Sequence, residues 1–113
     1  EKELVNVYRI MLKNLGYDVT AMYDSEEAIN LFRREPDKFD LLITDYTMPK
    51  LTGAELAFKI FEIKPDFPVI LCSGFSETLN REQVIEAGIK EFLMKPLNKK
   101  IVAQAIRKVL DKL

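Results

Sequence analysis

The chain has 113 residues, 48% of them hydrophobic and 31% charged, a balance typical of one globular domain that can bury a proper core. Its formal net charge of −1 argues against a nucleic-acid surface, because phosphate binding needs a clustered excess of Lys and Arg. No apolar run approaches the roughly 20 residues of a membrane span, and no signal peptide is visible, so we expect a cytoplasmic protein without membrane contact.

The sequence contains no histidine. This excludes Ser–His and Cys–His nucleophile pairs and histidine-based zinc sites, and any phosphohistidine chemistry must take its histidine from another molecule. The single cysteine, Cys72, ends the apolar run that begins at Val69. A buried structural thiol is favoured there over a reactive one, and a disulfide within the chain is impossible.

The first third of the chain predicts two helices with a short strand between them. Residues 3–15 carry an apolar stripe at three- and four-residue spacing, and Gly16 follows as a C-terminal stop. Residues 19–22 are a strand candidate. Ser25 is predicted as the N-cap of the second helix, which ends before Pro36.

A predicted strand then ends at a carboxylate. The apolar run from Leu41 to Ile43 does not alternate with polar residues, which is typical of a parallel strand buried on both faces, and Asp45 follows it. A charge is costly in a core unless it is paired, whereas at the carboxyl edge of an open α/β sheet it lies at the mouth of the ligand crevice. The alternative for this position is an ordinary turn-forming Asp that caps the next helix.

The rest of the chain continues to alternate helices with strands. The predicted segments are a helix capped by Thr52 and Glu55, a strand over 69–72, a helix over 80–87, a strand over 92–94 and an amphipathic helix over 98–112. This alternation indicates right-handed βαβ crossovers. We therefore expect an α/β fold, with a parallel sheet and helices on both of its faces.

Three of the four predicted strands end in polar residues of different kinds, namely Asp45, Ser73 and Lys95. Because the carboxyl ends of parallel strands lie at one edge of a sheet, we expect these side chains to converge. A carboxylate nucleophile, with a hydroxyl and an ammonium to hold the transferred oxygens, indicates an oxyanion or phosphoryl site. Singly, Lys95 is more often a surface lysine and Ser73 a turn residue, so the prediction depends on all three together.

Over residues 1–113 the sequence resembles the receiver domain of bacterial two-component response regulators. The matching features are a D-x-x-M-P-x-x-x-G run (Asp45, Met48, Pro49, Gly53), Ser73 at the end of the following strand, and Lys95-Pro96 at the end of the last strand. The resemblance implies a flavodoxin-like (βα)5 fold and a single receiver domain.

The resemblance also implies a role for each matching residue. Asp45 would be the phosphoacceptor and, with the backbone carbonyl of Thr47, a ligand of Mg²⁺. Ser73 and Lys95 would bind the phosphoryl group. Phe92 would be the aromatic residue that changes exposure when the hydroxyl moves, although a plain core aromatic is an equal alternative. The residues with implied structural roles are Pro49, Gly53 and Pro96, the last after a peptide bond that is typically cis in this family.

The function implied is that of a phosphoacceptor signalling domain. A sensor histidine kinase or phosphotransfer protein would deliver the phosphoryl group from its phosphohistidine to Asp45. The new charge would then switch a surface formed by residues 80–87, 91–94 and 98–112, which binds a downstream effector protein or domain. Such a domain is not an enzyme, beyond catalysing at most its own phosphorylation and dephosphorylation. No direct contact with nucleic acid is expected.

The sequence departs from the family at its start. The family normally begins with a further strand that ends in two acidic residues, which hold the magnesium, and Glu1 aligns just after that pair. We therefore expect weak or absent Mg²⁺ binding. Because neighbouring strands lie about 4.8 Å apart, we also expect a gap of roughly 10 Å between residues 19–22 and the strand over 41–44. Four explanations stay open: a segment of a longer protein, a re-paired sheet, a strand-exchanged dimer, or a degenerate receiver that is not phosphorylated.

Two competing functions also stay open. One is a receiver-fold interaction module without phosphorylation, as the missing acidic pair would suggest. The other is an aspartyl-phosphate hydrolase of the haloacid dehalogenase type, which also uses an Asp at a strand end. That family requires a second Asp two residues later, where this chain has Thr47.

Overall fold

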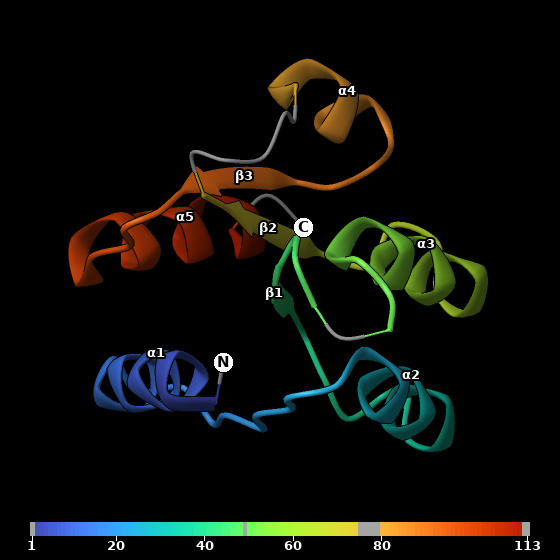
Figure 1. The fold of residues 1–113 in the computed structure, drawn as a ribbon, viewed down its shortest axis with the longest axis horizontal. Helices are drawn as coiled ribbons and strands as arrows, with labels where there is room; N and C mark the ends of the chain where they lie inside the picture. The colour runs from blue at the N-terminus through green and yellow to red at the C-terminus, as the bar shows by residue number, and fades with distance from the viewer. Residues whose placement is uncertain (1, 49, 75–79, 112–113) are drawn as a thin grey trace.

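In the computed structural model, residues 2–48, 50–74 and 80–111 are described. They form a parallel sheet of three strands in the order β1-β2-β3, surrounded by helices (Figure 1). The strands are β1 (Leu42–Asp45), β2 (Val69–Ser73) and β3 (Glu91–Met94). The helices are α1 (Lys2–Asn14), α2 (Ser25–Arg34), α3 (Gly53–Ile63), α4 (Arg81–Glu86) and α5 (Lys99–Leu110). The expected α/β architecture is confirmed.

The core lies on both faces of β2, the central strand, whose five residues are all buried. Successive side chains of a strand point to opposite faces. Val69 and Leu71 accordingly pack with apolar residues of α2 and α3, whereas Ile70 and Cys72 pack with those of α5. Figure 1 shows the matching layers, with α1 and α5 on one side of the sheet and α2 and α3 on the other.

Local capping chemistry explains where most helices begin. The predicted capping box of α3 is present, with the Glu55 N–H donating to Thr52 Oγ1 at 3.1 Å and the Thr52 N–H donating to Glu55 Oε1 at 2.9 Å. Asn80 and Asn98 cap α4 and α5 with their side-chain oxygens. The prediction for α2 was wrong by one position: the N-cap is Asp24, and Ser25 is the first helical residue.

The strand predicted over residues 19–22 does not form, and this part of the prediction was wrong. β1 pairs with β2 alone among the described strands, so residues 19–22 have no strand beside them. A strand needs a backbone partner to satisfy its N–H and C=O groups. A slot of about 510 Å³ is lined instead by residues 19–22, by 41–45 and by apolar side chains of α1 and α5. Re-pairing of β1 with residues 19–22 is thus not observed in the described part of the chain.

The helix bounds differ from the predicted ones by one or two residues. The helix predicted over 80–87 is α4, six residues long, and the one predicted over 98–112 is α5, which ends at Leu110. Within the described residues, none of the helices has the length and apolar character needed to cross a membrane.

Candidate functional site

Asp45 and Ser73, the last residues of β1 and β2, lie at the carboxyl edge of the sheet together with Lys95, which follows β3. Lys95 Nζ lies 3.1 Å from Asp45 Oδ2, so the two outer strands are joined by an ion pair that spans the central one. Ser73 ends β2 between them, and its backbone carbonyl accepts a hydrogen bond from the Lys95 N–H at 2.8 Å. The convergence predicted from parallel topology is therefore observed.

The three side chains differ in their access to water. The side chains of Asp45 and Lys95 are 19% and 26% exposed, so the ion pair is partly open to solvent. Ser73 is buried, and its hydroxyl donates to the carbonyl of Gly74 at 3.3 Å. The Ser73 hydroxyl therefore lies below the solvent-exposed part of this edge.

Electrostatics keep the ammonium of Lys95 charged. Burial by itself lowers the pKa of Lys95, but the hydrogen bond to Asp45 and the negative charge of that carboxylate outweigh it and raise the pKa above the usual value. The neighbouring thiol behaves in the opposite way. Burial and the charge of Asp45 raise the pKa of Cys72 to about 12, so this thiol stays protonated and inert, as expected of a structural cysteine.

Close packing against α3 fixes the backbone of Asp45. A Cβ atom on Gly53 would lie 2.2 Å from the carbonyl oxygen of Asp45, so only glycine fits at the start of α3. The Gly53 N–H donates to the carbonyl of Tyr46 at 2.7 Å, and the Thr44 hydroxyl donates to the carbonyl of Asp45 at 3.0 Å. The carboxylate therefore projects from a backbone that is held on several sides.

The loop after β1 is anchored by residues that sequence reasoning missed. The Leu51 N–H donates to the buried hydroxyl of Ser25 at 2.8 Å, and Lys50 Nζ pairs with Asp24 at 3.2 Å and with Glu26 at 3.1 Å. Asp24 takes the capping role at α2, which leaves the Ser25 hydroxyl available to the loop. The usable signal was the adjacent pair of capping residue types, since only one of them can cap a helix.

The other predicted site residues are placed as follows. Thr47 is exposed in the loop after β1, Phe92 is buried in the core on β3, and the Lys95–Pro96 peptide bond is cis. Pro49 lies outside the described residues. Phe92 thus occupies the core position that was the alternative to a switch role, and its exposure on phosphorylation stays a prediction.

The carboxylate of Asp45 lies at the edge where the resemblance implies a magnesium site, and the strength of Mg²⁺ binding there stays a prediction. Mg²⁺ prefers octahedral coordination by oxygen atoms and is usually held by one or two carboxylates together with waters and phosphate oxygens. No group of three or more His, Cys, Asp or Glu side chains that could hold a metal ion occurs in the described part of the chain. The one carboxylate of the site, Asp45, already pairs with the ammonium of Lys95.

Comparisons with known proteins point to one family. The family model for the response regulator receiver domain matches residues 1–107. The chemotaxis protein CheY of Thermotoga maritima is 31% identical over 106 residues, which cover 89% of this chain and 87% of CheY. A crystal structure of a response regulator receiver domain protein from Clostridium thermocellum has a TM-score of 0.93 at 27% identity, covering 99% of this chain and 89% of that one.

Other relatives are much longer than this chain. The alkaline phosphatase synthesis transcriptional regulatory protein PhoP of Bacillus subtilis is 28% identical over 110 residues, which are 97% of this chain but 45% of PhoP. The chain thus spans about half the length of several curated relatives that it matches.

Proposed function

We propose that Asp45 accepts a phosphoryl group and thereby switches a protein-interaction surface. The proposal proceeds from the fact that this chain belongs to the response regulator receiver domain family. The observation that carries this proposal is the pairing of Asp45 with Lys95 at 3.1 Å, beside Ser73, at the carboxyl edge of the sheet. A carboxylate with this exposure is an accessible nucleophile, and a cation lies beside it where phosphoryl charge arrives.

The transfer is a displacement at phosphorus. An oxygen of Asp45 forms a bond to the phosphorus of a phosphohistidine, the P–N bond breaks, and the histidine nitrogen leaves with the bonding pair and takes up a proton. These 113 residues contain no histidine, so the phosphohistidine lies outside them, and we propose a sensor histidine kinase or a phosphotransfer protein as its source. Lys95 stabilises the equatorial phosphoryl oxygens as charge spreads over them.

The product changes the electrostatics of the site. An acyl phosphate on Asp45 replaces a single carboxylate charge with a larger one and adds acceptor oxygens. Lys95 then pairs with the phosphoryl group, and the added oxygens can accept a hydrogen bond from the hydroxyl of Ser73. Both residues adjoin β3 and its flanking segments, so this change biases the surface of α4, β3 and α5 toward the form that binds an effector protein or domain.

A phosphodonor experiment tests the proposal. The small molecule phosphoramidate carries a P–N bond like that of phosphohistidine, and we expect it to add one phosphoryl group to the wild-type chain, seen by intact-mass spectrometry. Asp45→Asn should abolish the mass gain. Asp37→Asn is the matched control, because Asp37 is 91% exposed and lies away from the site, and it should label like the wild type. Equal labelling of the Asp45→Asn variant would overturn the assignment.

A second candidate function is favoured by one observation: no group of three or more His, Cys, Asp or Glu side chains placed to hold a metal ion occurs among the described residues. In that case the chain is an interaction module of receiver fold that is not phosphorylated. Partner binding would then be the same with and without phosphoramidate, and the same for wild type and Asp45→Asn. Labelling should also respond little to Mg²⁺ if the site binds this ion weakly, so a strong Mg²⁺ dependence would contradict our expectation of weak binding.

A further inference from the structure

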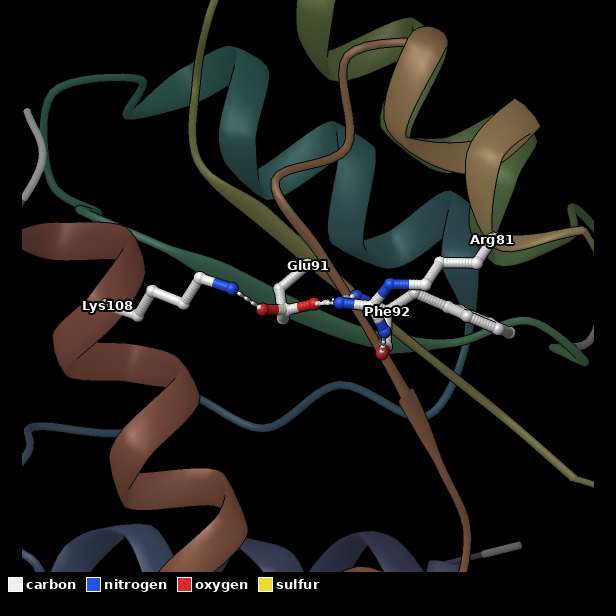
Figure 2. A network of polar contacts seen from close by, with 4 residues as sticks. All are labelled: Arg81, Glu91, Phe92 and Lys108. Carbon is white, nitrogen blue, oxygen red and sulfur yellow. Dashed lines mark hydrogen bonds and ion pairs between the residues drawn. The ribbon is translucent and has the colours of Figure 1, made fainter.

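A second charged cluster lies on β3, away from Asp45. Glu91 begins this strand, and its side chain is only 7% exposed. Figure 2 shows its carboxylate between two cations, with one oxygen facing the guanidinium of Arg81 on α4 and the other 3.0 Å from Lys108 Nζ on α5. The carboxylate of Glu91 therefore joins α4, β3 and α5.

The protonation state of Glu91 follows from these contacts. Burial by itself raises the pKa of Glu91, but hydrogen bonds from Lys108 and the Phe92 N–H, together with the charge of Arg81, outweigh it and lower the pKa. The carboxylate is therefore ionised at neutral pH and holds both cations.

Arg81 and Glu91 also form hydrogen bonds with backbone groups at the free edge of the sheet. β3 pairs with β2 on one side, and the backbone N–H of Lys95 donates to β2. Because the backbone groups of successive residues in a strand point to alternate sides, the N–H and C=O of Phe92 point away from β2, toward the free edge. The Phe92 N–H donates to Glu91 Oε1 at 3.0 Å, and the Phe92 carbonyl accepts from Arg81 Nη1 at 2.9 Å (Figure 2). Arg81 and Glu91 thus occupy backbone groups that an unprotected edge strand offers to other chains.

Helix α4 has little apolar anchoring of its own. It has six residues, of which Val84 is the one that is buried, whereas α5 buries Val102, Ala105, Ile106 and Val109. An isolated helix shorter than about 12–15 residues is marginal in water, so α4 depends on its contacts with the rest of the domain. Arg81 lies in its first turn and makes two of those contacts.

We propose that Glu91 is a latch for α4. Through Arg81, its carboxylate holds the helix against the free edge of β3, and breaking this link releases α4 while the sheet stays folded. Lys108 positions the carboxylate from the α5 side. The latch does not depend on phosphorylation of Asp45. If the proposed function also holds, the latch sets how readily the α4–β3–α5 surface rearranges.

Hydrogen exchange of backbone amides tests the latch. We expect the amides of residues 83–87 to exchange at least about tenfold faster in Glu91→Gln and in Arg81→Met, because hydrogen bonds to charged groups contribute on that order. The amides of β2, the buried central strand, should exchange faster by no more than the loss of global stability of the same variant requires. Arg81→Met leaves the pair between Glu91 and Lys108 intact, so it tests the link to α4 even if Glu91→Gln folds poorly.

Two further variants sharpen the test. Lys108→Met removes the contact from α5 but keeps Arg81. It should therefore increase the hydrogen exchange of the α4 amides less than Arg81→Met does. Asp37→Asn breaks a different ion pair, with Lys64 at 2.9 Å, and should leave α4 exchange unchanged. Exchange of residues 83–87 within twofold of wild type in Arg81→Met would overturn the latch. Acceleration of β2 beyond that of α4 would overturn it as well, since it would indicate that the variant destabilises the sheet rather than releasing α4.

Discussion

The unpaired edges of the two outer strands, β1 and β3, are covered in different ways. On β3, charged side chains bond to the outward-facing backbone of Phe92, and a helix is tied over that edge through Arg81. On β1, the side away from β2 faces a slot of about 510 Å³ with largely apolar walls, and no described strand pairs there. One edge is closed by directional polar contacts, whereas the other is left open beside apolar surface.

The difference matters because the proposed site spans both edges. Asp45 ends the strand beside the slot, and Lys95 follows the strand that carries Glu91, so their ion pair joins an open edge to a closed one. The β1 side must then gain its rigidity from α3 rather than from a neighbouring strand. The close contact between Gly53 and the Asp45 carbonyl supplies such support. Three substitutions separate these contributions, in decreasing order of expected effect.

The largest effect should come from Gly53→Ala. The added Cβ would lie 2.2 Å from the carbonyl oxygen of Asp45 and 2.8 Å from Leu71 Cδ1, so backbone must move. We expect the free energy of unfolding to fall by about 2–4 kcal/mol in urea titrations. Gly16→Ala is the matched control, because a Cβ there meets nothing within 4 Å and the cost is limited to a φ of +98°. A Gly53→Ala loss no larger than that of Gly16→Ala would show that α3 does not brace β1.

The next effect should come from Glu91→Gln on the opposite edge. Losing the charge that holds Arg81 and Lys108 should lower the free energy of unfolding by about 1.5–3 kcal/mol at pH 7. The folded-state pKa of Glu91 is lowered from its ordinary 4.5, so its contribution is complete above about that pH. It is lost as the pH falls below 4.5 through the folded-state pKa. The variant should therefore lose less stability than wild type between neutral and acidic pH, and identical pH profiles would contradict the assignment.

Sequence reasoning succeeded where local chemistry or topology decides the outcome. Thr52 and Glu55 form their capping box because both partners lie within one helical turn. Asp45 and Lys95 meet because parallel strands bring their carboxyl ends to one edge, whatever the distance along the chain. The fold and the meeting of the proposed site residues could therefore be predicted, although the chemical role of each one stays a prediction.

The failures concern pairings that no local pattern encodes. Residues 19–22 have the composition of a strand, but a strand also needs a neighbour, and the described residues provide none. Glu91 is 10 residues from Arg81 and 17 residues from Lys108 along the chain, and neither separation matches the periodicity of a helix or a strand. Their association depends on how α4 and α5 pack against β3, which is a property of the folded chain.

The smallest effect should come from Lys95→Met, although this residue is central to the proposed site. Its ion pair with Asp45 is partly exposed to water, with side chains 26% and 19% accessible, and such pairs contribute about 0.2–1 kcal/mol. We expect the free energy of unfolding at pH 7 to change by no more than that amount, with the difference shrinking as salt is added. Phosphoramidate labelling of Asp45 should fall much more, because Lys95 acts on charge that develops during transfer. A large loss of stability with unchanged labelling would mean that the pair joins the two edges as a structural tie and does not serve phosphoryl chemistry.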